Sequence, residues 1–375
     1  MGGRHQLRAM KDGLNKRAIR RLGENLSKAH TRFDVEGFVT AALQGIESLE
    51  LKARVTHIAT VMGEFLPEDR REAIRGLLSA IPHWDRGSAD DNLRGFATWP
   101  VFVFVEMHGL DIGDYALRAL GELTHLFTAE FSVRPFIEKN PEMAMAVIQE
   151  WTRHPKEDVR RLASEGIRPR LPWAGKLALF VQDPAPVVSV LDTLIDDDAL
   201  YVRRSVANCL SDIAADHPDL AIATCKRWLA KPTEYRRWIA KRATRNLIKS
   251  GHPEVWALHG FTAKPDVEVA QLRIDPQTVS MDQSFSIFFE LVSKARVEQR
   301  LVVDFVVHHV KAKGAPSPKV FKLCELALQA GQIVPLQKRH TFRTITTRRY
   351  YPGPHRIEIQ INGERYAEAF VTLAI

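Results

Sequence analysis

The segment NPEMAMAVIQEW (Asn140–Trp151) returns later in the chain as HPDLAIATCKRW (His217–Trp228). Each copy opens on a polar residue followed by proline, which is typical of a helix N-terminus. Arg160 follows Trp151 at the same distance in sequence as Arg237 follows Trp228. A third segment, Asp183–Asn208, lies between the two copies and shares their start, a polar residue followed by proline, and the arginine of the repeat. Units of about 40 residues, each a pair of helices, predict a HEAT-like or armadillo-like α-solenoid.

The helical periodicity extends from these segments over residues 11–262. After Lys264-Pro265, apolar residues alternate with polar ones, and Asn362-Gly363 is typical of a two-residue hairpin turn. About seven strand candidates predict an immunoglobulin-like β-sandwich over residues 263–375. We therefore expect a mainly α protein, in which a HEAT-like α-solenoid precedes a C-terminal immunoglobulin-like domain. Residues 1–10 are interpreted as an added leader, because Met10 offers a second start.

The composition favours an acidic partner, since 53 Lys and Arg face 45 Asp and Glu, for a formal net charge of +8. Nucleic acid and an anionic membrane surface both fit this charge. No apolar run is long enough for a transmembrane helix, and no signal peptide is evident. The widely spaced Cys209, Cys225 and Cys324 predict neither disulfides nor a zinc site. We expect a cytoplasmic protein without a metal.

Three carboxylates fall at related positions of the repeats. Glu130 and Glu165 are each followed by Arg-Pro within a few residues. One repeat later, Asn208 takes the position of Glu165, and Asp212 follows on the same helix face. The three carboxylates are therefore expected to line one concave patch. Acidic groups inside a basic trough are typical of a DNA-processing enzyme, in which the basic rim binds phosphates.

The candidate DNA contacts around these carboxylates are Arg161, Arg168, Arg170, Arg203, Arg204, Asn208, Arg242 and Arg245. Trp173 could stack on DNA or on a cationic base, or it could be a core anchor between repeats, as Trp151 and Trp228 are expected to be. In the second domain the candidates are Lys338, Arg339, Arg343, Arg348 and Arg349. That basic, aromatic segment could bind a phosphate backbone, or it could be an ordinary solvated edge strand.

A simpler interpretation of the acidic residues stays open. Glu130 could pair with Arg134, and Glu165 could pair with its arginine neighbours, as surface ion pairs worth only about 0–1 kcal/mol. The protein would then be a non-catalytic HEAT-repeat scaffold that binds DNA structures or a protein partner. A magnesium-dependent nuclease is less favoured, because the trough lacks a D-x-D type pair.

Two further strings carry a family resemblance. SEGIRPRLPW (Ser164–Trp173) and VRRSVAN (Val202–Asn208) resemble hallmarks of AlkC-type DNA alkylation repair proteins, which are related to the AlkD type. Ala129–Phe136 and Lys249–Pro253 fit the same family, so the likeness spans the helical part of the chain. One branch of this family carries a C-terminal immunoglobulin-like domain, and the chain looks like that branch.

The resemblance implies a monofunctional DNA glycosylase of base excision repair. Its substrates would be 3-methyladenine and 3-methylcytosine in double-stranded DNA, cleaved without base flipping and without a metal or organic cofactor. The resemblance also implies that Glu130, Glu165 and Asp212 are catalytic and that Trp173 contacts the lesioned nucleotide. We expect Glu165 to lie nearest the sugar, and the protein to act as a monomer.

Overall fold

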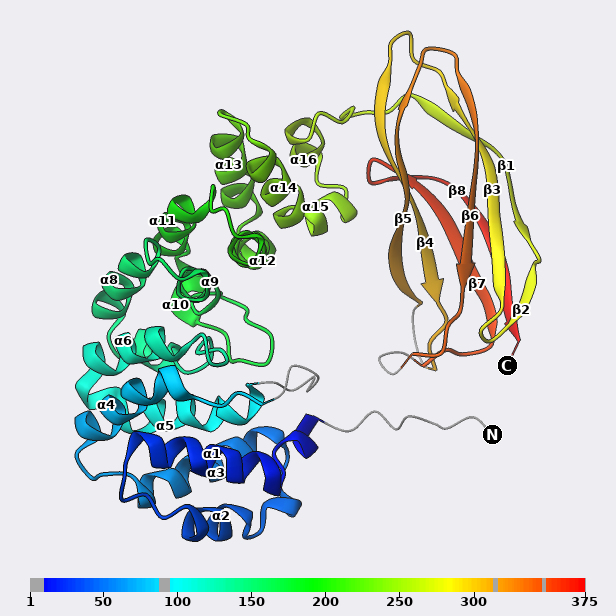
Figure 1. The fold of residues 1–375 in the computed structure, drawn as a ribbon. Helices are drawn as coiled ribbons and strands as arrows, with labels where there is room; N and C mark the ends of the chain where they lie inside the picture. The colour runs from blue at the N-terminus through cyan, green and yellow to red at the C-terminus, as the bar shows by residue number, and fades with distance from the viewer. Residues whose placement is uncertain (1–9, 88–94, 313–315, 346–348, 375) are drawn as a thin grey trace. The chain divides into compact units, whose positions relative to one another are not determined.

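The computed structural model describes residues 10–87, 95–312, 316–345 and 349–374. Within these residues, helices precede strands, as Figure 1 shows by colour along the chain. The predicted fold class, a helical part followed by an immunoglobulin-like sandwich, is confirmed. Residues 1–9 of the expected leader (1–10) and Arg348 lie outside the described residues.

The helices have the following bounds: α1 (Lys16–Ala29), α2 (Val35–Leu43), α3 (Leu51–Phe65), α4 (Arg70–Ala80), α5 (Trp99–Gly109), α6 (Gly113–Leu123), α7 (Arg134–Lys139), α8 (Pro141–Trp151), α9 (Glu157–Glu165), α10 (Ala178–Gln182), α11 (Ala185–Leu194), α12 (Leu200–Asp216), α13 (Pro218–Leu229), α14 (Glu234–Ala243), α15 (Arg245–Lys249) and α16 (Pro253–Leu258). Short 3-10 turns occur at Met10–Gly13, Ile46–Ser48, Ile81–His83, Phe96–Thr98 and Leu110–Ile112.

The three aligned segments fold as the helix pairs α8/α9, α11/α12 and α13/α14. Asn140 caps α8, because its side chain accepts a hydrogen bond from Met143 N at 3.2 Å. Trp151 is the last residue of α8 and Trp228 the last but one of α13, and they are 6% and 3% exposed. They are the predicted core anchors, which explains why the repeat retains a large aromatic residue there.

Packing divides the chain inside its helical part. The first unit comprises residues 1–216 and 233–239, and the second comprises residues 217–232 and 240–375. Helices α13, α15 and α16 therefore belong to the same unit as the sandwich strands, and α14 is divided between the two units. The predicted boundary between residues 262 and 263 marks the change from helices to strands, and as a domain limit it stays a prediction.

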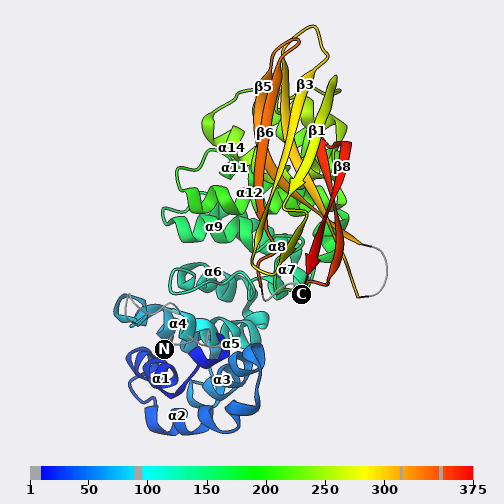
Figure 2. The same ribbon diagram turned by 90° about the vertical axis from the view of Figure 1, so that its right-hand side faces the viewer.

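The strands have the following bounds: β1 (Val267–Asp275), β2 (Thr278–Ser280), β3 (Ser284–Ser293), β4 (Gln299–His309), β5 (Ser317–Leu328), β6 (Ile333–Thr341), β7 (Gly353–Ile361) and β8 (Glu364–Ala374). They form one sheet in the order β1-β3-β6, which Figure 2 shows from the right-hand side of Figure 1, and another in the order β2-β8-β7-β4-β5. The alternating residues Phe285, Ile287 and Phe289 are buried in the core, as are Ile357, Ile359 and Ile361. The predicted alternation of apolar and polar residues therefore marks the side chains on the inner faces of the two sheets.

The Asn362-Gly363 turn joins β7 to β8 and anchors the sandwich to the last helices of the second unit. Both residues have positive φ, of 44° and 83°, as a primed hairpin turn requires. The Asn362 side chain accepts a hydrogen bond from Val302 N at 2.6 Å and donates one to Thr262 O at 2.7 Å. A Cβ atom on Gly363 would lie 2.2 Å from Gly251 Cα, two residues after the end of α15.

Gly363→Ala is therefore expected to destabilise the second unit by more than the roughly 1 kcal/mol that a positive φ costs alanine. Gly331→Ala is the matched control, since Gly331 has a φ of 67° and a Cβ atom added there would meet no other atom within 4 Å. Urea unfolding followed by circular dichroism gives both losses. Equal losses would show that the contact between the turn and Gly251 contributes nothing.

Candidate active site

The three predicted carboxylates come together in the first unit. Glu165 is the last residue of α9, Asp212 lies on α12, which packs against α9, and Glu130 lies in the turn before α7. Their side chains are 8%, 15% and 13% exposed. The repeat positions therefore identify one buried cluster.

Two arginines join these carboxylates into a continuous row. Arg168 Nη1 lies 2.6 Å from Glu165 Oε1, and its Nε and Nη2 lie 2.8 and 3.1 Å from the Asp212 oxygens. Arg161 Nη1 lies 2.6 Å from Glu130 Oε2, and Arg161 Nη2 lies 3.5 Å from Glu165 Oε1. Three carboxylates and two guanidinium groups leave the row with a formal charge of −1.

Burial sets the electrostatics of this carboxylate–arginine row. It raises the pKa of Asp212, and the Arg168 guanidinium partly offsets that effect. Burial acts to lower the pKa of Arg168, but its bonds to Asp212 and Glu165 outweigh it, so the pKa of Arg168 is raised. Arg168 therefore stays charged and fixes two carboxylates that would otherwise repel each other.

The ion-pair interpretation from sequence is correct for Glu165, which contacts Arg161 and Arg168. It is wrong for Glu130, whose partner is Arg161, on the second helix of the next pair, rather than Arg134. The structure thus places Arg161 and Arg168 as counter-ions inside the row. Direct contact of either arginine with DNA stays a prediction.

Arg134 has a role that the sequence pattern did not reveal. Its side chain is buried and donates hydrogen bonds to the carbonyls of Gly166 (3.2 Å), Arg168 (2.9 Å) and Gly175 (2.5 Å). One guanidinium therefore fixes both ends of the segment between α9 and α10. The shared Glu…Arg-Pro pattern indicated that Arg134 is important, but it did not indicate that the acceptors are backbone carbonyls.

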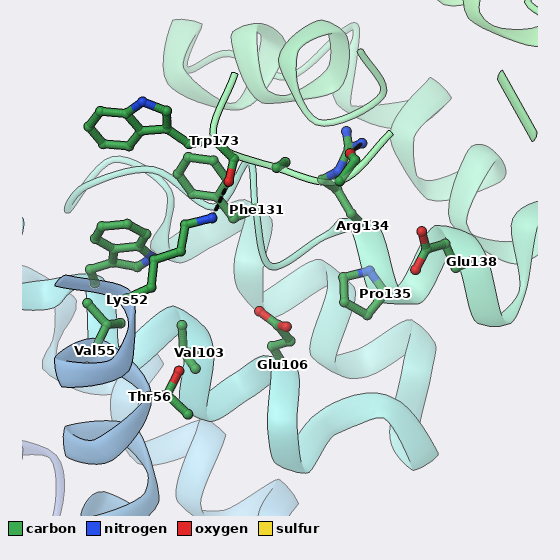
Figure 3. Close-up of a pocket in the computed structure, with 13 residues that line it drawn as sticks. Lys52, Val55, Thr56, Val103, Glu106, Phe131, Arg134, Pro135, Glu138 and Trp173 are labelled. Carbon is green, nitrogen blue, oxygen red and sulfur yellow. Dashed lines mark hydrogen bonds between the residues drawn. The ribbon is translucent and has the colours of Figure 1, made fainter. Parts of the chain in front are cut away.

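That segment presents Trp173. The residue has a φ of 67°, which non-glycine residues rarely adopt, and it is 57% exposed. Its carbonyl accepts a hydrogen bond from Lys52 Nζ of α3, drawn as a dashed line in Figure 3. Trp173 is therefore not the core anchor that the simpler interpretation suggested, and its indole is available for a ligand.

Trp173 borders a cavity of about 340 Å³ that Glu130, Glu165 and Arg168 also line. The other described lining residues include Phe96, Trp99, Phe127, Phe131, Leu171 and Pro172. We call this space the site cavity. Asp212 is linked to it through Arg168. A carboxylate pair beside an aromatic wall can stabilise positive charge that develops on a bound ring.

The remaining arginines of the first unit differ in their surroundings. Arg170 forms a two-pronged pair with Asp216, with its Nε 2.6 Å from a carboxylate oxygen. Arg203 donates to two backbone carbonyls and stacks on Tyr235, with 3.6 Å from its guanidinium carbon to the ring centroid. Arg204 is exposed on the α12 face that also carries Asn208 and Asp212. Arg204 is therefore the candidate best placed to bind phosphate.

The other predicted contacts belong to the second unit. Arg245 is exposed and donates to the Arg242 carbonyl at 2.7 Å. Lys338 and Arg339 lie on β6, an edge strand, with Arg339 exposed. Arg343 and Arg349 are exposed as well. Their contacts with DNA stay predictions.

Membrane spans and metal clusters are both absent from the described residues. None of the described helices is long and apolar enough to cross a membrane. No cluster of three or more His, Cys, Asp or Glu side chains suited to a metal ion occurs in the part of the chain that the structure describes.

These features define a class of helical-repeat proteins with a buried carboxylate–arginine row beside an aromatic cavity, followed by an immunoglobulin-like domain. Comparisons with known proteins identify the family within this class. Residues 268–375 match the family model described as "Uncharacterised protein YhaZ, C-terminal Ig-like domain". The uncharacterized protein YhaZ of Bacillus subtilis is 32% identical over 95% of this chain and 96% of its own length.

A solved structure matches almost the whole chain. It is the Pseudomonas fluorescens alkylpurine DNA glycosylase AlkC, bound to DNA containing an abasic site analog. The match has a TM-score of 0.90 and 34% identity, and it covers 98% of this chain and 100% of that one. The chain belongs to the AlkC/YhaZ family, as a homologue of an alkylpurine DNA glycosylase.

Proposed function

We propose that the protein is a monofunctional DNA glycosylase that removes cationic alkylated bases from double-stranded DNA. The observation that carries the proposal is that Glu130 and Glu165 line an aromatic cavity while two buried arginines hold them in place. The homologous AlkC, by its description, is an alkylpurine DNA glycosylase and binds DNA with an abasic site analog. As substrates we propose 3-methyladenine and 3-methylcytosine.

The proposed reaction needs charge stabilisation more than acid catalysis. An N3-methylated base is already cationic, so the bond from its ring nitrogen to C1′ breaks with the electron pair leaving on the base, which becomes neutral. Positive charge develops on the deoxyribose, as in other glycoside cleavages. Water then forms the new C1′–O bond and gives up a proton to a carboxylate or to solvent. A fixed anion near C1′ is favoured more in this transition state than in the ground state.

We infer that Glu165 is the carboxylate nearest the sugar, because it lines the site cavity and lies at the centre of the row. Glu130 would align the attacking water from the same cavity. Asp212 would act through Arg168, which binds both Asp212 and Glu165. Trp173 would contact the lesioned nucleotide at the cavity mouth, without the base being flipped into a closed pocket.

A non-catalytic scaffold is the alternative, and the burial of the row argues against it. Removing charges from water is expensive, and replacing a buried ion pair by apolar residues is often neutral or stabilising. A scaffold would gain nothing from two buried carboxylates that line an aromatic cavity. An enzyme that stabilises positive charge on a sugar would gain from such carboxylates.

The test is release of bases from methylated double-stranded DNA, in EDTA, followed by chromatography. We expect free 3-methyladenine and 3-methylcytosine to appear and the DNA strands to stay intact. Strand breaks that EDTA abolishes would instead indicate a metal-dependent nuclease. Tight DNA binding without base release would indicate the scaffold.

Arg204→Gln is expected to weaken DNA binding. It should also reduce, by about one unit, the slope of the logarithm of the binding constant against the logarithm of salt concentration (the salt slope), because one phosphate contact accounts for about that much. Arg153→Gln is the charge-matched control, since Arg153 is also exposed but lies before the first turn of α9, at the opposite end from Glu165. Affinities measured across a series of salt concentrations give both slopes. An unchanged slope for Arg204→Gln would exclude a phosphate contact.

A further inference from the structure

A second cavity, of about 330 Å³, lies beside the site cavity within the first unit (Figure 3). The two cavities share Trp99, Phe131 and Trp173 as lining residues. Val55, Val103 and Pro135 add apolar surface to the second cavity. The second cavity is therefore lined in part by the same aromatic side chains as the site cavity.

Glu106 supplies a carboxylate to this second cavity. It projects from α5 toward the space that Lys52, Phe131 and Pro135 surround (Figure 3). Burial raises its pKa, and the Ser132 hydroxyl acts in the opposite direction. No Lys, Arg or His among the described residues forms an ion pair with Glu106. This carboxylate thus differs from those of the row, which have arginine partners.

The cations that line the second cavity are already engaged. Lys52 Nζ donates to the Trp173 carbonyl, and Arg134 donates to three backbone carbonyls. An anionic ligand would have to compete for these groups, whereas a ligand with N–H donors would find the Glu106 carboxylate. The Trp99 and Phe131 rings are stacked, with 5.4 Å between their centroids and an interplanar angle of 27°. A flat aromatic ligand therefore suits the aromatic wall that the two cavities share.

We propose that the second cavity binds the free alkylated base after excision, with its ring against the shared aromatic wall and its amino group donating to Glu106. This inference rests on the proposed function, because glycosidic cleavage supplies the base. Its consequence is that the base leaves the site cavity without having to diffuse directly into solvent.

Binding of free 3-methyladenine, measured by calorimetry in the absence of DNA, tests the proposal. The wild-type protein is expected to bind it, and Glu106→Gln should weaken binding about tenfold, because a charge-assisted hydrogen bond becomes a neutral one. Val103→Phe should abolish binding by filling the cavity from its half-buried wall. Glu138→Gln is the matched control, since the exposed Glu138 lines the same cavity and its loss should change little.

The same assay separates this inference from the proposed function. Glu165→Gln should bind the free base as the wild type does, although it should not excise bases. No binding by the wild type, or equal binding by wild type and Val103→Phe in their folded forms, would overturn the second cavity as the base site even if excision is intact. Base binding without excision from methylated DNA would instead refute the proposed function and leave a base-binding cavity without its product role.

Discussion

Glu165→Gln is expected to lower the single-turnover rate of 3-methyladenine release by about 10²–10³-fold, the loss typical of removing one preorganised electrostatic group. The substitution keeps the shape of the side chain, and the amide oxygen can still accept the Arg168 hydrogen bond. It removes the charge that would face C1′, and with it the excess negative charge of the row. DNA affinity should change little, because Glu165 is buried and contributes no phosphate contact.

Glu157→Gln provides the control for charge on the same helix, since Glu157 is exposed in the first turn of α9. Its release rate should equal that of the wild type. Full excision by a folded Glu165→Gln protein would show that this carboxylate is not the one nearest the sugar. Loss of DNA binding together with excision would point to a disturbed fold instead, which circular dichroism would reveal.

The repeat pattern predicted which carboxylates meet, because equivalent positions in a solenoid lie on the same face of successive units. Glu165 and its equivalent position Asn208 follow from that rule, and Asp212 lies one helical turn after Asn208 on the same face. The repeat rule does not predict whether the side chains of Arg161 and Arg168 point to the carboxylates or to DNA, since a guanidinium binds both carboxylate and phosphate. Only the packed structure shows that both arginines turn inward to the row.

The environment of Trp173 could not be predicted for a different reason. Its positive φ depends on a segment fixed from elsewhere, by Arg134 on α7 and by Lys52 on α3. Hydrogen bonds between such distant parts of the chain leave no local sequence signal. Glu106 is similar, because it follows an apolar helical stretch and has no equivalent in the repeats. Its position in a cavity appears only when α3, α5 and α7 are assembled.

Arg168→Met is expected to destabilise the first unit by about 3–5 kcal/mol, because it leaves Glu165 and Asp212 buried without their shared counter-ion. Arg118→Met is the matched control. Arg118 also joins two carboxylates, those of Asp114 and Glu150, but all three side chains are at least 45% exposed, so water replaces the lost partner. Urea unfolding measures both variants.

The loss in Arg168→Met should also depend on pH. Without the guanidinium, burial raises the folded-state pKa of Asp212 further. A carboxyl whose pKa is higher in the folded state binds its proton more tightly there, so folding is favoured below the unfolded pKa and loses free energy as pH rises above it. The destabilisation relative to the wild type should therefore be larger at pH 8 than at pH 5, since both values lie above the pKa of roughly 4 that an Asp side chain has in the unfolded chain. A loss that is the same at both values would mean that water or another cation replaces Arg168, and that the row does not depend on its central arginine.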